Sequence, residues 1–259
     1  MLDLAIFAAL PWERRTALGG LWGVEAGDTP RTWRGRLGDG AACLVVETGM
    51  GPARARAAAE AAPEAARFLA FGCAGGLVPG LAPGDLVAAD ALIVLDAAGR
   101  PGERLSADAA PLAAWTGPRG VAITVGAVAT SPVVLATPAE KAAAAACGAV
   151  AVDMESAAVA AVARARGIPC TALRAIVDAA ADDLALGGEL IDPATGRIRV
   201  ARAVARLAPR PWLWPRAAEL ARRRQVCERA LAAVATLALG AGGRAVFDGA
   251  PAPPRALAR

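Results

Sequence analysis

Short apolar runs rich in β-branched residues alternate with alanine-rich stretches along most of the chain, and this alternation is the strongest constraint on its fold. Such runs are typical of buried strands, and the stretches between them are typical of helices. We expect strands at Leu4–Ala9, Cys43–Thr48, Arg67–Gly72, Leu86–Leu95, Val121–Ala129, Ala149–Asp153 and Cys170–Val177. We expect helices at Pro52–Ala66, Pro138–Ala146 and Met154–Arg166. This order predicts an α/β fold, a single domain with a central mixed β-sheet flanked by helices.

The last quarter of the chain differs in charge from the rest. From Arg197 onward it holds 13 Arg and 3 acidic residues, a net charge of +10, whereas residues 1–196 carry a net charge of −6. We expect a basic helix at Arg197–Ala208, a break at the segment 209–215, which is rich in Pro and Trp, and a long helix at Arg216–Leu239. The sequence therefore predicts a core at 1–196, a basic helical extension packed on it at 197–240, and a loose tail at 241–259.

The composition excludes several kinds of chemistry. The chain has no His and no Tyr, and its 28 basic residues are 27 Arg and one Lys, Lys141. Mechanisms that need a histidine base, a histidine-bound metal or a Ser-His-Asp triad are therefore excluded. The five cysteines are scattered without a Cys-x-x-Cys pair, which argues against a zinc site or a disulfide framework. Acid–base chemistry must rest on carboxylates, and we expect no metal.

The sequence also predicts where the protein works. It begins Met-Leu-Asp without a basic region, which is unlike a signal peptide. The longest uncharged run, Gly120–Ala139, contains two Pro and four hydroxyl residues, so we expect a strand and a turn there and no transmembrane helix. The scattered cysteines fit a reducing cytoplasm. We therefore expect a cytoplasmic protein that contacts the inner membrane surface through its basic extension.

A glycine-rich stretch is the first candidate for a binding site. Phe71–Leu77 follows an expected strand and holds three glycines. We expect a turn here, which would let a ligand approach backbone N–H groups closely. A tight structural turn is the alternative interpretation. The stretch does not match the Gly-x-Gly-x-x-Gly fingerprint of dinucleotide-binding proteins.

Acidic residues at strand ends are the second set of candidates. Asp153 and Glu155 flank Met154 where a strand leads into a helix, and Asp178 ends an apolar strand. Open α/β sheets bind ligands at such strand ends, and partial burial raises the pKa of a carboxyl group into the range useful for an acid. Charge at a helix N-terminus and simple strand termination are the alternative interpretations. Glu13, which follows the first strand, is by itself typical of a surface acid.

Five motifs in register between about Leu4 and Asp178 resemble the nucleoside phosphorylase/nucleosidase superfamily, and within it the methylthioadenosine/S-adenosylhomocysteine nucleosidases. They are the first strand with Glu13, Glu47–Gly51, Gly72–Leu77, Val152–Glu155 and Arg174–Asp178. The resemblance implies cleavage of an N-glycosidic bond. That reaction passes through an oxocarbenium-like state, so an enzyme must neutralise the departing purine and support the cationic ribose.

The resemblance also implies roles for individual residues. Asp178 would protonate the purine at N7, Glu155 would hold the ribose hydroxyls, and Glu13 would activate the attacking water. Substrate would be bound by Met50, Cys73, Ala74, Gly75, Asp153 and Met154. Two of these positions and one neighbour depart from the family: Asp153 replaces Glu, Cys73 replaces Ser, and Val177 replaces the usual Ser before the aspartate, which removes an orienting hydrogen bond.

The resemblance implies no cofactor, with phosphate as the possible co-substrate. The Gly-Asp-Pro-x-Arg motif of the hexameric phosphorylases is absent, and Ala70 stands near the position of their phosphate-binding Arg, which favours water as the nucleophile. A cluster of cations could still form an anion site, namely Arg14, Arg15, Arg54 and Arg56.

The extension resembles the hopanoid-associated phosphorylase branch of the superfamily, which implies adenosylhopane as substrate. Arg residues on one helix face with Trp212 and Trp214 nearby are typical of interfacial segments, so we expect residues 197–224 to contact an anionic membrane. Arg-rich coding bias, or a helix pair that forms a dimer or covers the core, is the alternative. A methylthioadenosine/S-adenosylhomocysteine nucleosidase and a non-catalytic nucleoside-binding protein are the other functions considered. We expect a homo-oligomer and no nucleic-acid binding.

Overall fold

The computed structural model describes residues 2–113, 122–184, 192 and 209–242. The expected basic helix at 197–208 and residues 243–259 of the expected tail lie outside this part of the chain. The strands are β1 (Leu2–Ala8), β2 (Trp22–Ala26), β3 (Thr32–Arg36), β4 (Ala42–Glu47), β5 (Ala65–Gly76), β6 (Leu86–Leu95), β7 (Pro101–Ser106), β8 (Ile123–Thr130), β9 (Ala151–Asp153) and β10 (Cys170–Asp178). The helices are α1 (Pro11–Leu18), α2 (Pro52–Ala61), α3 (Ala110–Ala113), α4 (Pro138–Ala145), α5 (Ser156–Ala165) and α7 (Trp214–Val234), with a 3₁₀ turn at Pro211–Leu213 and a π-helical end at Ala235–Gly242.

All ten described strands join one mixed sheet in the order β10-β6-β8-β9-β5-β1-β4-β3-β2, with β7 paired to β6. Strand β5 also pairs with β10, so β10, β6, β8, β9 and β5 close into a ring. The pairs β1–β4, β1–β5, β5–β10, β6–β8 and β8–β9 are parallel, and the others are antiparallel. The predicted α/β fold with a mixed sheet between helices is confirmed.

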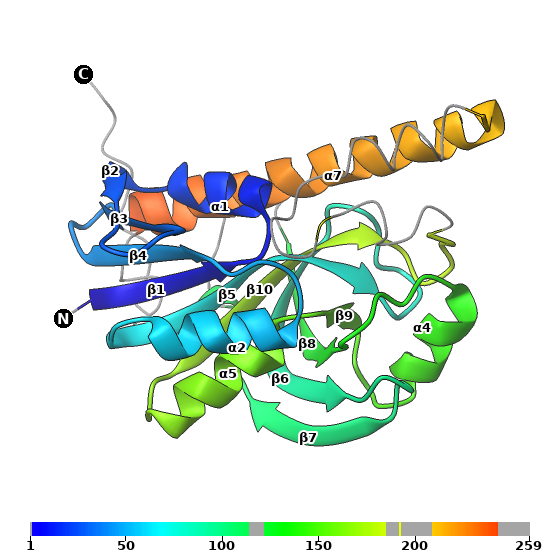
Figure 1. The fold of residues 1–259 in the computed structure, drawn as a ribbon, viewed down its shortest axis with the longest axis horizontal. Helices are drawn as coiled ribbons and strands as arrows, with labels where there is room; N and C mark the ends of the chain where they lie inside the picture. The colour runs from blue at the N-terminus through cyan, green and yellow to red at the C-terminus, as the bar shows by residue number, and fades with distance from the viewer. Residues whose placement is uncertain (1, 114–121, 185–191, 193–208, 243–259) are drawn as a thin grey trace.

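Helices cover both faces of the sheet (Figure 1). Helices α2 and α5 pack on one face, where Val159 and Ala163 are buried against the strands. Helices α1 and α7 cover the other face, and Cys227 and Leu231 of α7 lie in a second apolar cluster with residues of β1 and β4. The three fully buried residues of α7 all lie in its second half, whereas its first turns have none. The described part of the C-terminal extension therefore packs on the sheet by one end only.

The expected turn after Gly72 is wrong. Strand β5 continues to Gly76, because Gly75 and Gly76 pair with Val152 and Ala151 of β9. Strand β10 also runs beside β5 as far as Gly75. Pairing on both sides keeps this glycine-rich segment extended, so its glycines contribute close packing and not a change of chain direction.

Other boundaries differ for local reasons. Helix α2 ends at Ala61 and not at Ala66, because Ala62 precedes a proline and takes an extended backbone, which residues before proline favour. Helix α5 begins at Ser156, which leaves Met154 between the strand and the helix. Three strands were not expected at all, β2, β3 and β7, because their residues are mostly exposed or half-buried and lack an apolar run.

Candidate active site

Glu13 is the first carboxylate of the site, and it is buried where β1 leads into α1. Its Oε2 accepts hydrogen bonds from the backbone N–H groups of Ala9 at 3.0 Å and Leu10 at 2.9 Å. Its Oε1 accepts one from Cys73 N–H at 2.8 Å, on β5. Burial raises the pKa of Glu13, although Arg174 and these N–H donors oppose the shift. The sequence alone indicated a surface acid, but the structure places Glu13 in the interior at the end of the sheet.

Glu155 is the second carboxylate, at the N-terminus of α5. Its Oε1 accepts the backbone N–H of Gly51 at 2.7 Å. Burial raises the pKa of Glu155 to about 8, with Arg174 lowering it and Asp153 raising it further. Burial thus favours the protonated form of Glu155, in which the carboxyl group can donate a hydrogen bond as well as accept one.

Arg174 links these acids, and sequence reasoning gave it no role. It lies in the middle of β10 with a side chain only 1% exposed. Its Nη2 pairs with Asp153 Oδ2 at 2.7 Å, and its Nε and Nη2 donate to Ser156 Oγ at 3.0 and 2.8 Å. Burial lowers the pKa of Arg174, but the charges of Asp153, Glu155 and Glu13 raise it by more. An Arg inside an apolar strand requires buried partners, and that was the available signal.

Asp153 is oriented toward this arginine and its own chain. Besides Arg174, it accepts hydrogen bonds from Thr130 Oγ1 at 2.7 Å and from Ser156 N–H at 3.2 Å. Both of its carboxylate oxygens therefore have partners inside the protein. Asp153 therefore holds the Arg174 guanidinium in place by an ion pair and orients the first turn of α5 through Ser156 N–H.

Asp178 is the third predicted acid, and it ends β10 in the interior. Its Oδ2 forms an ion pair with Lys141 of α4. Within the described residues this buried oxygen has no hydrogen-bond partner of good geometry, so the charge of Lys141 is its main polar contact. Burial raises the pKa of Asp178, while the contact with Lys141 opposes the shift. A carboxyl group in this setting is suited to carry a proton near neutral pH.

The glycine-rich strand β5 runs between these acids. A Cβ added to Gly72 would lie 2.5 Å from Glu13 Oε1 and 2.7 Å from Arg174 Nη1, and one added to Gly75 would lie 3.1 Å from Asp178 Oδ2. At position 72 only glycine leaves room for the Glu13 carboxylate, and at position 75 a Cβ would make a tight contact with the Asp178 carboxylate. The segment Cys73–Gly75 thus has Glu13 at one end and Asp178 at the other. Of the remaining predicted binding residues, Met50 precedes the donor Gly51, and Met154 precedes Glu155; both are half-buried.

Two of the four arginines considered for a phosphate site already have acidic partners. Arg14 pairs with Glu47 at 3.4 Å, and its guanidinium lies 4.2 Å from the centre of the Trp33 ring. Arg56 lies 3.9 Å from Glu60 on its own helix. No cluster of His, Cys, Asp and Glu within the described residues could hold a metal ion.

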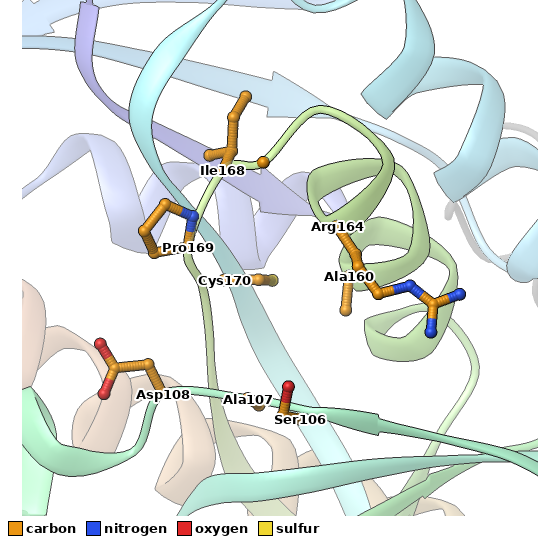
Figure 2. A pocket seen from close by; sticks show the side chains of 9 residues that line it. Ser106, Ala107, Asp108, Ala160, Arg164, Ile168, Pro169 and Cys170 are labelled. Carbon is orange, nitrogen blue, oxygen red and sulfur yellow. The ribbon is translucent and has the colours of Figure 1, made fainter.

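A separate pocket of about 510 Å³ lies at the opposite end of the strands. Cys170, which begins β10, lines it together with 106–108 of β7 and its following loop. Figure 2 shows Asp108 and Arg164 on opposite sides of this pocket. Asp108 pairs with Arg67 at 2.7 Å, and Arg164 pairs with Glu103 at 2.6 Å. Its charged groups are thus already paired, and none of the predicted catalytic carboxylates lies in it.

The model of the phosphorylase superfamily matches residues 3–208. The chain belongs to this superfamily. A comparison with curated protein sequences gives no significant match.

Solved structures of nucleosidases share the fold at low identity. The methylthioadenosine/S-adenosylhomocysteine nucleosidase of Neisseria meningitidis, in complex with methylthio-immucillin-A, is 19% identical with a TM-score of 0.68, over 91% of this chain and 98% of that one. Futalosine hydrolase of Helicobacter pylori is 20% identical with a TM-score of 0.64, over 91% and 98%. The methylthioadenosine/S-adenosylhomocysteine nucleosidase of Helicobacter pylori is 23% identical with a TM-score of 0.61, over 70% and 87%.

Proposed function

We propose that the protein hydrolyses the N-glycosidic bond of a 5′-modified adenosine and releases adenine. The observation that carries this proposal is the placement of Glu13 and Asp178 at the two ends of Cys73–Gly75, both buried and both with a raised pKa. A nucleoside lying along this segment would have Asp178, the general acid, beside its purine. It would have Glu13, the general base, beside its anomeric carbon C1′. Membership of the phosphorylase superfamily supports this chemistry.

The proposed reaction balances with these groups alone. A water oxygen bonds to C1′ while the C1′–N9 bond breaks and its electron pair enters the purine. Asp178 gives its proton to N7, and Glu13 takes a proton from the water. The products are adenine and a 5′-modified ribose, and the proton on Glu13 returns through solvent to Asp178. Stabilisation of the leaving group and of the nucleophile is thereby divided between two carboxylates.

Glu155 would hold the ribose in this scheme. Gly51 N–H fixes one of its oxygens, and the other oxygen can bond to the 2′- and 3′-hydroxyls. Burial raises the pKa of Glu155 to about 8, and its second oxygen would accept hydrogen bonds from these hydroxyls. Such hydrogen bonds would strengthen as positive charge develops on the ribose, without transfer of a proton from Glu155.

Water is the preferred nucleophile in this proposal. Arg174, the arginine nearest to Glu13 and Glu155, is already bonded to Asp153 and Ser156, so a phosphate dianion would compete with a buried carboxylate for it. Arg14 would have to give up its contact with Glu47. The exchange at Arg174 is costly because its partner Asp153 is buried, which favours hydrolysis over phosphorolysis.

For the 5′ group we propose a large apolar substituent, with adenosylhopane as the first candidate. The start of α7 supports this choice, because Trp212 and Trp214 are 68% and 56% exposed beside exposed Arg210 and Arg216. Trp and Arg exposed together are typical of segments that bind an anionic membrane interface, where a lipid-linked nucleoside would be found. No helix in the described ranges is both long and apolar enough to cross a membrane.

Adenine release from a panel of adenosines tests the proposal. The panel compares methylthioadenosine, S-adenosylhomocysteine and an adenosine with a hopane or long alkyl group at C5′, each with and without phosphate. We expect turnover without phosphate and the highest kcat/KM for the apolar group. Preference for the two sulfur nucleosides would instead identify a recycling nucleosidase, the function named for the Neisseria structure. Binding of adenosine analogues without turnover would identify a nucleoside-binding protein.

Variants of Glu13 and Asp178 test the proposed catalytic roles in the same assay. Glu13→Gln and Asp178→Asn should each lower kcat by about 10²- to 10⁴-fold, the usual contribution of general acid–base catalysis. The exposed Asp96→Asn is the matched control and should keep full activity, because Asp96 contacts only its own turn and Arg100. Full activity of Asp178→Asn would show that the acid is assigned wrongly.

A flotation assay with vesicles tests the proposed membrane contact separately. The wild type should float with vesicles containing anionic lipid, and Trp212→Ala/Trp214→Ala should remain at the bottom. Trp22→Ala is the matched control, because Trp22 is 69% exposed on β2, which lies at the other end of α7 from Trp212 and Trp214 (Figure 1). Equal flotation of all three proteins, or of none, would reject the contact.

A further inference from the structure

Lys141 is the only lysine of the chain, and its side chain is only 1% exposed. Its Nζ forms an ion pair with Asp178 Oδ2 and donates to the backbone oxygens of Ala179 at 2.8 Å and Asp182 at 3.1 Å. Two of the three donors of its ammonium group are used by the backbone oxygens, and its charge is paired with the Asp178 carboxylate. A buried charge is tolerated only with such partners, so the environment of Lys141 is specific and not incidental.

The start of helix α4 determines where Lys141 lies. Thr137 Oγ1 accepts the backbone N–H of Glu140 at 3.3 Å, and Glu140 Oε2 accepts the backbone N–H of Thr137 at 2.9 Å, which forms a capping box. Pro138 occupies the first turn. The cap fixes the direction of the first turn, and Lys141 follows it on the inner face of the helix. The lysine thus reaches Asp178 from a rigid element.

The same contacts connect Asp178 to the C-terminal helix. Asp182, whose backbone oxygen accepts from Lys141, uses its carboxylate to accept from Ala179 N–H at 2.6 Å and from Arg223 of α7 at 2.5 and 3.2 Å. Arg223 Nε also donates to Glu219 at 2.9 Å, one turn earlier on α7. The turn that follows Asp178 is therefore held by hydrogen bonds from two helices, through Lys141 of α4 and Arg223 of α7.

We propose that Lys141 is a positioning residue that orients Asp178 toward the purine, and that Arg223 supports it by fixing Asp182. The proposal rests on the proposed function, in which Asp178 acts on the base. Val177 precedes Asp178 and has no hydrogen-bonding side chain, so an adjacent hydroxyl does not orient the carboxylate here. Lys141, from a different element, supplies an orienting contact. The basic C-terminal helix then takes part in assembling the site as well as covering the sheet.

Removal of Lys141 would change both the orientation and the charge around Asp178. The charged and titratable groups that face Asp178 are Lys141 from α4, Asp182 from the following turn, and Arg223 and Cys227 from α7. Lys141 and Arg223 lower the pKa of Asp178, and Asp182 raises it. Loss of either cation should therefore raise the pKa of Asp178 further, with the larger effect for Lys141 because of its direct contact.

The test compares Lys141→Met, Lys141→Arg and Arg223→Gln with the wild type, and Arg224→Gln serves as the matched control, because Arg224 is exposed and lies 3.8 Å from Glu228 on α7. The first measurement is the titration of the Asp178 carboxyl group by ¹³C NMR, assigned with Asp178→Asn. The second is kcat and KM for adenine release as a function of pH. The NMR titration does not depend on turnover.

We expect Lys141→Met to move the Asp178 titration to higher pH and to lower kcat by about 10- to 100-fold, as misplacement of a catalytic group does, with a smaller change in KM. Arg223→Gln should also raise the titration pH of Asp178 and lower kcat, but by less. Lys141→Arg should recover part of the kcat that Lys141→Met loses, and Arg224→Gln should match the wild type. An unchanged Asp178 titration in Lys141→Met and Arg223→Gln would overturn the proposal. If Lys141→Met does not fold, Arg223→Gln and Lys141→Arg decide by the same criteria. If the wild type releases no adenine from any nucleoside, the proposed function fails, and the NMR titration still decides whether Lys141 acts on Asp178.

Discussion

The backbone N–H of Gly51 donates to Oε1 of Glu155 at 2.7 Å, and so joins the loop after β4 to the start of α5 across 104 residues of sequence. Gly51 makes this contact with φ of 96° and ψ of 156°, a conformation that is essentially restricted to glycine. A Cβ at this position would meet nothing within 4 Å. The requirement for glycine is therefore one of backbone conformation and not of space.

Gly51→Ala should accordingly lower the free energy of unfolding by about 1–3 kcal/mol and raise KM, because the alanine moves the donor away from Glu155. Urea denaturation and adenine-release kinetics measure the two effects. Gly40→Ala is the control, since Gly40 has φ of 87° with open space around it, in a hairpin loop far from Glu155 in sequence. It should lose stability without a change in KM. A rise in KM in both variants would mean that Gly51 has no special role in the site.

Gly72→Ala should be more damaging for a different reason. Its Cβ would overlap Glu13 and Arg174, both of which are buried and hydrogen-bonded, so neither side chain can move aside cheaply. Overpacking of this kind costs about 1–3 kcal/mol, and displacement of Glu13 should reduce kcat at least tenfold. Gly102→Ala on β7 is the control, because its Cβ would make only an ordinary contact at 3.6 Å with Val94 O. Equal stability and activity of the two variants would contradict the close packing at Gly72.

The pKa of Glu155 predicts how stability depends on pH. Its pKa is about 8 in the folded protein against 4.5 for a free glutamate, so the folded state holds this proton more tightly than the unfolded state does. The stability associated with Glu155 is then fully present below pH 4.5 and is lost as the pH rises through 8. Glu155→Gln, which cannot ionise, should lose less stability than the wild type over this range. Parallel curves of unfolding free energy against pH would contradict the raised pKa.

The strand-end pattern predicted that Asp153 and Asp178 lie at one end of the sheet, whereas Glu13 was assigned to the same site only by the family resemblance. The structure shows why these residues meet. Parallel strands such as β1, β5 and β10 end at the same side, so residues that follow them must lie close together. The partners of those acids could not be predicted in the same way. Lys141 and Arg174 carry no motif, and their contacts depend on how α4 and β10 pack in three dimensions. A single lysine among 27 arginines, and an arginine within an apolar strand, were visible signals without an assignable partner.

Secondary structure was predicted best where burial leaves a clear pattern. The strands that became β1, β4 and β6 have nearly continuous apolar residues, and they are buried on both faces. The strands β2 and β3 form an exposed hairpin at the open side of the sheet, and each has only five residues without a continuous apolar run. The extension of β5 through its glycines depended on pairing with β9, a partner that lies some 75 residues away in sequence.

Alkylation of the cysteines offers the last prediction, with Cys147 expected to react first in the folded protein. Cys43, Cys170 and Cys227 are buried, and burial raises the pKa of each thiol. Cys73 is half-buried, and burial together with the charge of Glu13 raises its pKa well above 9.0. Because the thiolate is the reactive form, these four should react slowly at pH 7.5.

Iodoacetamide labelling followed by peptide mass spectrometry measures this order, and all five cysteines should react at similar rates once the protein is unfolded. Glu13→Gln should speed the reaction of Cys73 selectively, because it removes a negative charge next to the forming thiolate. The rate at Cys43 should stay as in the wild type, since Asp3 and not Glu13 is the charge that acts on it. Labelling of Cys73 as fast as Cys147 in the folded wild type would contradict its burial. An unchanged rate at Cys73 in Glu13→Gln would show that no negative charge of Glu13 acts on this thiol.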